Sequence, residues 1–199
     1  IRALAEVKSP EVVDVLIDVL AKIPLLGTRN PNRPFVRTPR PGTQQPAVFF
    51  GDNASDAIAL TLPTLDAQLF LELTQRASAH SDWRVRAALM KVLAKTLFDG
   101  ATNDQGEVSP GAAGLLNRPE VVQAQDAALL DPQKDVRAWA AVGLGLAYVK
   151  ITDNPEQTAS RRAALIQGLR DPNLHIASVC GSYLQRESGG ASWNPASDD

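Results

Sequence analysis

Three segments of this 199-residue chain repeat one pattern of apolar residues, and this repetition is what most constrains the fold. The segments start at Val85, Val136 and Ile176, and each has apolar residues or glycine at positions i, i+3, i+4, i+7 and i+8. That spacing places the apolar residues on one face of a helix that turns every 3.6 residues. Because all three helices share one phase and each follows a short polar turn, the sequence predicts a repeating helical unit.

A further helix is predicted before each of these three. The six predicted helices lie at 65–79, 82–98, 119–130, 133–149, 155–170 and 173–186. The Asp-Pro pairs at 131–132 and 171–172 are predicted to end the first helix of a unit and cap the second, while Asn117 and Asn154 are predicted to cap first helices. Val136 and Ile176 are 40 residues apart and Val85 and Val136 are 51 apart, so residues 99–114 are predicted to form a long loop.

The pattern Asp-Pro-x-x-x-Val-Arg-x-x-Ala, which spans 131–140, resembles HEAT repeats, including the type found in phycobilin lyases. The resemblance covers 63–186 and implies an all-α fold, a right-handed α-solenoid of three to four stacked antiparallel helix pairs. It also implies a structural ladder of turn aspartates and arginines between neighbouring repeats. By position, the ladder residues would be Asp135 with Arg137, and Arg84 with Arg86. The third unit departs from the pattern, because Ala177 replaces the arginine and His175 the aspartate.

The rest of the chain is expected to extend this array. Residues 1–7 resemble the end of a second helix, and a first helix is predicted from Pro10 to Ile23, so we expect the chain to begin within a repeat. Residues 1–187 are therefore predicted to be one repeat array with a proline- and arginine-rich insertion at 24–56. Residues 188–199 are interpreted as a polar tail or linker, which favours a module of a larger protein.

The insertion is the strongest candidate for a binding site, because a repeat stack uses most of its own residues for packing. It has four arginines, no acid before Asp52, and an aromatic pair after them. The predicted partner-binding residues are Arg29, Arg33, Arg37, Arg40, Phe49 and Phe50. Prolines stiffen such a segment, and its guanidinium groups could bind carboxylates or phosphates of an acidic or phosphorylated protein. The alternative is an ordinary surface loop whose phenylalanines fold back on it.

Catalytic signals are few. His80 and His175 lie at predicted turns without a second residue at metal-ligand spacing, so we expect no metal site. Cys180 falls on the apolar stripe, where a free cysteine packs as a small hydrophobe. Residues 99–107 match a calcium loop poorly, and no cofactor is expected. No apolar run is long enough to span a membrane, so no transmembrane segment is expected.

These observations favour a non-catalytic protein-interaction or scaffold module. The second helices usually line the concave side of HEAT stacks, and the cationic residues assigned to that face are Arg86, Lys91, Arg137 and Lys150. The alternative is a HEAT-type enzyme or enzyme subunit, similar to phycobilin lyases or to DNA glycosylases. A net charge of −2 argues against nucleic acid as the partner. Trp139 is predicted to fill space between repeats, whereas Trp83 is either a surface contact or part of loop packing.

Overall fold

The computed structural model describes residues 9–23, 58–59, 61–97 and 109–187, and within these ranges the regular elements are all helical. They begin with α1 (Glu11–Leu20), the short 3₁₀ helix η2 (Leu62–Thr64), α3 (Ala67–Ser78) and α4 (Trp83–Lys95). They continue with α5 (Pro110–Leu116), α6 (Pro119–Ala128), α7 (Lys134–Lys150), α8 (Pro155–Gly168) and α9 (Leu174–Glu187). The all-α class is therefore confirmed. The six predicted helices agree with α3, α4 and α6 to α9, most closely where the apolar period is regular.

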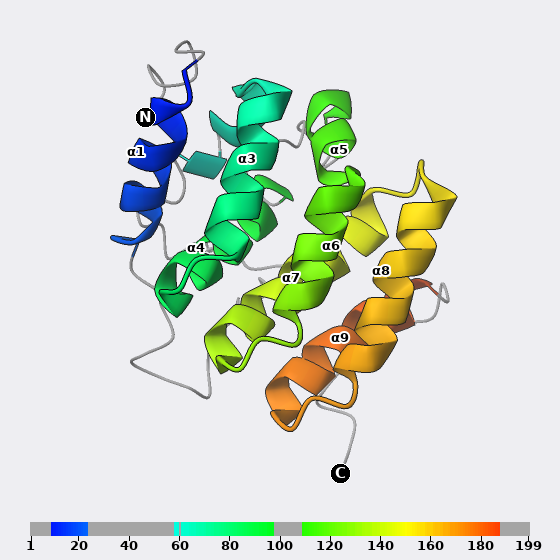
Figure 1. Cartoon of the computed structure of the whole chain (residues 1–199). Coiled ribbons are helices and arrows are strands. Elements are labelled where there is room, and N and C mark those ends of the chain that lie inside the picture. Colours follow the sequence, from blue (N-terminus) through cyan, green and yellow to red (C-terminus); the bar gives the residue numbers. More distant parts are fainter. Residues whose placement is uncertain (1–8, 24–57, 60, 98–108, 188–199) are drawn as a thin grey trace, which may run out of the picture.

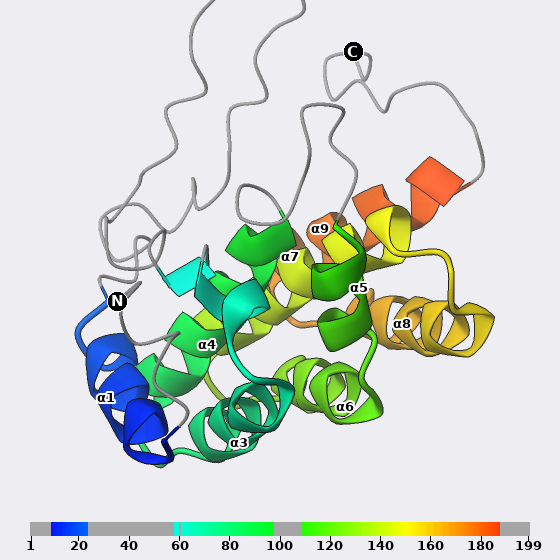
Figure 2. The same cartoon turned by 90° about the horizontal axis from the view of Figure 1, so that it is seen from above.

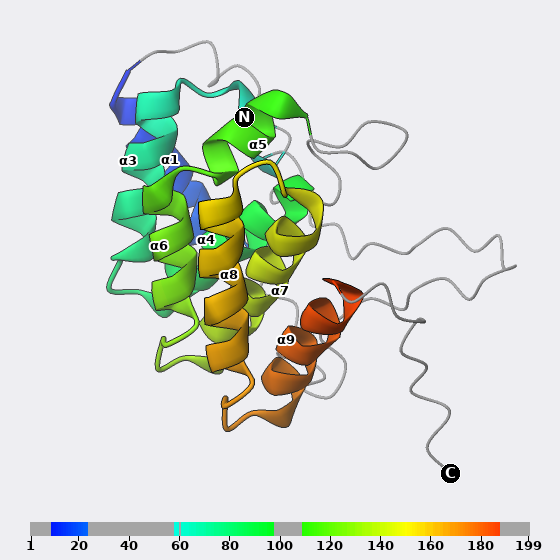
Figure 3. The ribbon, with the colours of Figure 1, turned by 90° about the vertical axis from the view of Figure 1, so that its right-hand side faces the viewer.

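The helices lie in two layers (Figures 1 and 2). One layer contains α1, α3, α6 and α8 in chain order, and the other contains α4, α7 and α9. Helices that follow each other along the chain contact across the layers, as α3 does with α4, α6 with α7, and α8 with α9. Within a layer each helix contacts the next one, and Figure 3 shows α6 beside α8.

The core lies between the two layers. The apolar stripe predicted for the helix at 82–98 is fully buried in α4, including Val85, Leu89 and Leu93. In α7 the residues Val136, Ala140 and Leu144 occupy the same positions and are also buried. Because α7 contacts both α4 and α9, it is buried on two sides, which explains why its sequence is apolar over most of its length.

Two glycines let the helices approach closely. A Cβ atom built on Gly145 of α7 would lie 1.9 Å from Cδ2 of Tyr183, so the tyrosine ring rests directly on the α7 backbone. A Cβ on Gly168 would lie 2.5 Å from Sγ of Cys180, which brings α8 and α9 together. Cys180 is thus a buried core residue, and burial raises the pKa of its thiol to about 11.

A helix, α5, begins within the region predicted as a loop at 99–114 and ends just after it, at Leu116. Ser109 caps it by accepting a hydrogen bond from the backbone N–H of Ala112, and Pro110 suits the first turn because it has no N–H to satisfy. Because this region is rich in glycine and small residues, the sequence did not predict the helix. Residues 98–108, which include the weak calcium-loop match, lie outside the described residues.

The predicted caps are correct in part. Asn154 caps α8 by accepting from the backbone N–H of Gln157 at 3.1 Å. Asn117 does not cap α6, because it ends α5 and its side chain binds other residues. Asp131 accepts from the N–H of Gln133 at 2.8 Å in the turn, and α7 begins only after Gln133. The Asp-Pro pair therefore shapes the turn and does not itself start the helix.

Candidate functional site

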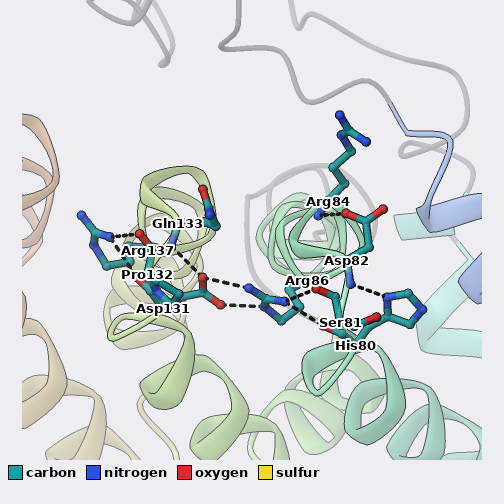
Figure 4. Close-up of polar contacts among 9 residues, drawn as sticks. All are labelled: His80, Ser81, Asp82, Arg84, Arg86, Asp131, Pro132, Gln133 and Arg137. Atoms are coloured by element: carbon teal, nitrogen blue, oxygen red, sulfur yellow. Dashed lines mark hydrogen bonds and ion pairs between the residues drawn. The ribbon is translucent and has the colours of Figure 1, made fainter.

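The most regular polar arrangement in the described residues lies at the turns between the layers (Figure 4). Arg86, in the first turn of α4, reaches the turn before α7 and binds Asp131 through two parallel hydrogen bonds. The distances are 2.7 Å from Nε to Oδ2 and 3.1 Å from Nη2 to Oδ1. Its Nη1 donates to the backbone oxygens of His80 at 2.7 Å and Ser81 at 3.1 Å. The hydrogen bond to Asp131 raises the pKa of Arg86, so this guanidinium stays charged.

The same arrangement recurs at the next junction. Arg137 of α7 binds Asp171 with 2.7 Å from Nε to Oδ2 and 3.2 Å from Nη2 to Oδ1. Its Nη1 donates to the backbone oxygens of Asp131 at 2.8 Å and Pro132 at 3.2 Å. Each arginine therefore holds its own turn and the following one, and the matching distances show that the two junctions are built alike.

Aligned residues explain where this ladder of arginine–aspartate pairs starts and stops. His80 occupies the position of Asp131, and its Nδ1 accepts from the N–H of Asp82 at 3.1 Å, as Asp131 accepts from the N–H two residues further on. The imidazole thus replaces the carboxylate within the turn, but offers no negative charge to an arginine. At the other end Ala177 occupies the position of Arg137, so the third unit has no guanidinium to extend the ladder.

The acidic partners differ from those expected. Arg86 and Arg137 are ladder residues, but their carboxylates come from Asp131 and Asp171 of the following turn, and Asp135 is not one of them. Arg84 also lies outside the ladder: its guanidinium is 5.6 Å from the ring centroid of Trp83. Asp131 and Asp171 could have been found from the sequence, because both recur before a proline. That recurrence was interpreted only as capping.

A second polar cluster is centred on Arg161, whose side chain is 0% exposed. Its Nη2 donates to the backbone oxygen of Leu116 and its Nη1 to Oδ1 of Asn117, both at 2.8 Å. Asn117 in turn donates to Asp153 at 2.9 Å. Burial lowers the pKa of Arg161 to about 10. The cluster attaches the end of α5 to α8, so its observed role is structural.

Arg161 was missed by the sequence analysis, although the alignment contained a signal. It occupies the position of Val121 in α6 and Phe70 in α3, both of which are buried apolar residues. A single arginine at an apolar position of a repeat indicates a buried hydrogen-bond acceptor nearby. That acceptor is the end of α5, which the sequence analysis did not predict.

Two neighbouring residues of α6 retain unsatisfied polar atoms. Both side-chain atoms of Gln125 are buried without a hydrogen-bond partner, as is Oδ1 of Asp126. The other oxygen of Asp126 accepts from Ser160 of α8 at 3.3 Å. Burial raises the pKa of Asp126 because the charged form loses hydration. The two residues therefore lie in the packing between helices and not on an open surface.

A cavity of about 280 Å³ lies instead between the first two helix pairs, beside Arg86 and Asp131. Ser78 lines it, and the equivalent residue at the following junction is the larger Leu129, which is buried there. The smaller side chain accounts for the space. Alanines and Met90 form much of the remaining wall, and the two charged residues already bind each other. The cavity therefore offers little chemistry for recognising a ligand.

The cationic residues assigned to the second-helix layer do not form one open patch. Arg86 and Arg137 belong to the turns, and Lys91 is buried with its Nζ 5.9 Å from the ring centroid of Trp139. Lys150 donates to the backbone oxygen of Leu97 at 2.8 Å. Trp139 is partly buried against the core, in agreement with the expected filling role.

The remaining sequence-based sites divide into those the structure describes and those it does not. The predicted partner-binding residues lie outside the described residues: Arg29, Arg33, Arg37, Arg40, Phe49 and Phe50. His80 is a turn residue, and partial burial lowers the pKa of His175. Within the described ranges, no group of three or more His, Cys, Asp or Glu side chains is placed to hold a metal ion. Among the helices described, none is both long and apolar enough to cross a membrane.

Comparisons with known proteins add no assignment. No family model matches this chain, and no curated protein matches it.

Proposed function

We propose that this chain is a HEAT-like repeat module, a right-handed array of stacked helix pairs that serves as a protein-binding scaffold. The observation that carries the proposal is the ladder: Arg86–Asp131 and Arg137–Asp171 join successive helix pairs with nearly identical geometry. One such pair could be incidental. A repeat of the same four-bond arrangement supports a repeating unit, and repeat arrays act by presenting extended surfaces to partners.

The insertion at 24–56 is the proposed contact with the partner. Its four arginines, Arg29 to Arg40, precede the first acid at Asp52, while the whole chain has a net charge of only −2. Such a local excess of guanidinium groups suits an acidic or phosphorylated protein segment, because each guanidinium can bind carboxylate or phosphate oxygens through paired hydrogen bonds. Phe49 and Phe50 would add an apolar anchor beside the charges.

The test compares two variants of the 199-residue chain, each with four cationic residues changed to serine, which remove equal charge. One variant changes the insertion residues Arg29, Arg33, Arg37 and Arg40. The matched control changes exposed cationic residues of the helical part: Lys22, Arg84, Arg118 and Lys134. Binding is measured by fluorescence anisotropy against a panel of acidic peptides, each in phosphorylated and unphosphorylated form, at two salt concentrations.

We expect the unmodified chain and the control to bind a subset of the peptides, more weakly at higher salt, and the insertion variant to lose this binding. The stability of the insertion variant should change by no more than about 0.5 kcal/mol, as for other surface substitutions. Equal loss of binding in both variants would show that only total charge matters. Unfolding of the insertion variant would show that these arginines are structural, and the loop interpretation would replace the proposal.

A further inference from the structure

The outer face of α8, at one end of the helix row, exposes two apolar side chains, one of which has a buried equivalent in α6. Ile166 is 40% exposed and Leu169 is 45% exposed. Leu129, the residue of α6 equivalent to Leu169, is 6% exposed. The difference has a direct cause: α8 covers Leu129, whose Cδ1 lies 3.9 Å from the position of a Cβ atom on Gly168. Nothing among the described residues covers α8 in the same way (Figure 1).

The exposed residues form one stripe along α8. Arg162, Ile166 and Leu169 are spaced three and four residues apart, so they lie on one side of the helix. Their equivalents in α6 are Val122, Asp126 and Leu129, which form the side that meets α8, as the contact from Ser160 to Asp126 shows. The α8 stripe is therefore the same surface, one unit further along, that is used at the preceding junction.

The stripe is more apolar in its middle than its internal equivalent. Ile166 replaces Asp126, so a helix placed against α8 would meet an isoleucine where Ser160 meets a carboxylate. Ala177 replaces the ladder arginine, so this end requires no acid from whatever binds it. This face therefore suits an apolar helix that lacks the ladder aspartate.

The other end of the row presents such a helix. In α1, Val15 is 43% exposed and lies one turn from the partly buried Val19. Asp14 lies about 100° from Val15 around the helix and is turned towards α3, because it pairs with Arg76. Val15 and Val19 therefore lie on the side turned away from α3, at the opposite end of the row from α8 (Figure 1).

Charge also favours contact between unlike ends. Apart from Asp14, which pairs with Arg76, the exposed charged residues of α1 and the residues just after it are two acids and one base, Glu11, Asp18 and Lys22. The outer stripe of α8 has Arg162, and Arg170 is exposed at the end of the same helix. Two α8 faces would bring like charges together, as would two α1 faces, whereas α1 against α8 places acids near arginines.

From these observations we infer that the chain associates head to tail, with the α1 end of one copy, through Val15 and Val19, docking on the α8 stripe of another. The contact extends the helix row from one molecule to the next. It is a heterologous contact, so each bound copy leaves one further end free, and assemblies grow with concentration unless the row closes into a ring. Without an arginine–aspartate pair it is weaker than the internal junctions, so association is reversible.

The test blocks each end separately in the 199-residue chain. Leu169→Lys blocks the α8 end, Val15→Lys blocks the α1 end, and Leu130→Lys is the matched control. Leu130 is 65% exposed at the turn between α6 and α7, away from both ends. Mass is measured by sedimentation velocity over a range of concentrations, and circular dichroism checks that each variant is folded.

We expect the average mass of the unmodified chain and of the control to rise with concentration, and each blocked variant to remain a monomer. An equimolar mixture of the two blocked variants should form dimers and nothing larger, because it retains one good α8 end and one good α1 end. A chain that stays monomeric at every concentration would overturn the inference. So would blocked variants that dimerise alone, or a mixture that stays monomeric. The measurement uses no peptide, so its failure is distinct from failure of the proposed partner binding.

Discussion

Gly145→Ala tests the packing of α7 against α9 with the smallest change available. The new Cβ would lie 1.9 Å, 2.3 Å and 2.4 Å from three carbons of the Tyr183 ring, all far below van der Waals contact. Tyr183 is buried, so its ring can make room only by leaving its site or by moving α9. Overpacking of this kind costs about 1–3 kcal/mol, and displacing a buried aromatic ring adds about 1.5–3 kcal/mol.

An opposing effect must be subtracted. Alanine is favoured over glycine within a helix by about 1 kcal/mol. The net expectation is a loss of about 1.5–5 kcal/mol in the free energy of unfolding, measured by urea denaturation with an unchanged dependence on denaturant. Gly114→Ala in α5 is the matched control, because a Cβ there meets no atom within 4 Å. The control should gain up to about 1 kcal/mol from helix propensity alone.

A double variant isolates the contact itself. Tyr183→Ala removes the ring and destabilises the protein, but in that background Gly145→Ala should cause no further loss, since the new methyl group then has space. The reasoning is refuted if Gly145→Ala alone leaves the protein as stable as the parent chain. It is equally refuted if the two substitutions are additive, because the cost would then come from somewhere other than the ring.

Two further predictions concern charged residues. Arg137→Lys should lower the free energy of unfolding by about 1–3 kcal/mol, because lysine cannot reproduce the paired bonds to Asp171 and the two carbonyl contacts of the turn. Asp126→Asn should increase stability at pH 7, since burial raises the pKa of Asp126 and ionisation there disfavours the native state. This gain in stability should shrink as the pH falls from the raised pKa of native Asp126 towards the ordinary pKa of an aspartate. Over this range the carboxyl group of the native protein becomes protonated and uncharged.

Each of these has a simple control. Arg84→Lys changes an exposed arginine outside the ladder and should alter stability by no more than about 0.5 kcal/mol. Equal effects of the lysine substitutions at Arg84 and Arg137 would contradict a structural role for the ladder. For Asp126, the control is Asp18→Asn on the exposed side of α1. If the stability difference between the Asp126→Asn variant and the parent protein stays constant from pH 7 to acid, the carboxylate charge is not its cause.

The sequence by itself determined the helical class and most helix positions, because a stripe of apolar residues with period 3.6 can be buried in only one way. The stripe in 133–149 predicted α7 nearly to the residue. The same local reasoning located Arg86 and Arg137 at the turns. It failed for α5, which has only 7 residues and includes Gly111 and Gly114, so too little periodic pattern was present.

The tertiary structure decided which residues meet across units. The resemblance to HEAT repeats implied a pairing of Asp135 with Arg137. The side chain that accepts the hydrogen bonds of Arg137 is instead Asp171, which is 34 residues away and approaches only when α8 and α9 pack against α7. The buried position of Arg161 was likewise decided by the end of α5, 45 residues earlier. Helix periodicity is a local property and can be read along the chain. The partner of a charged side chain depends on where distant segments come together, and only the packing of the helices determines that.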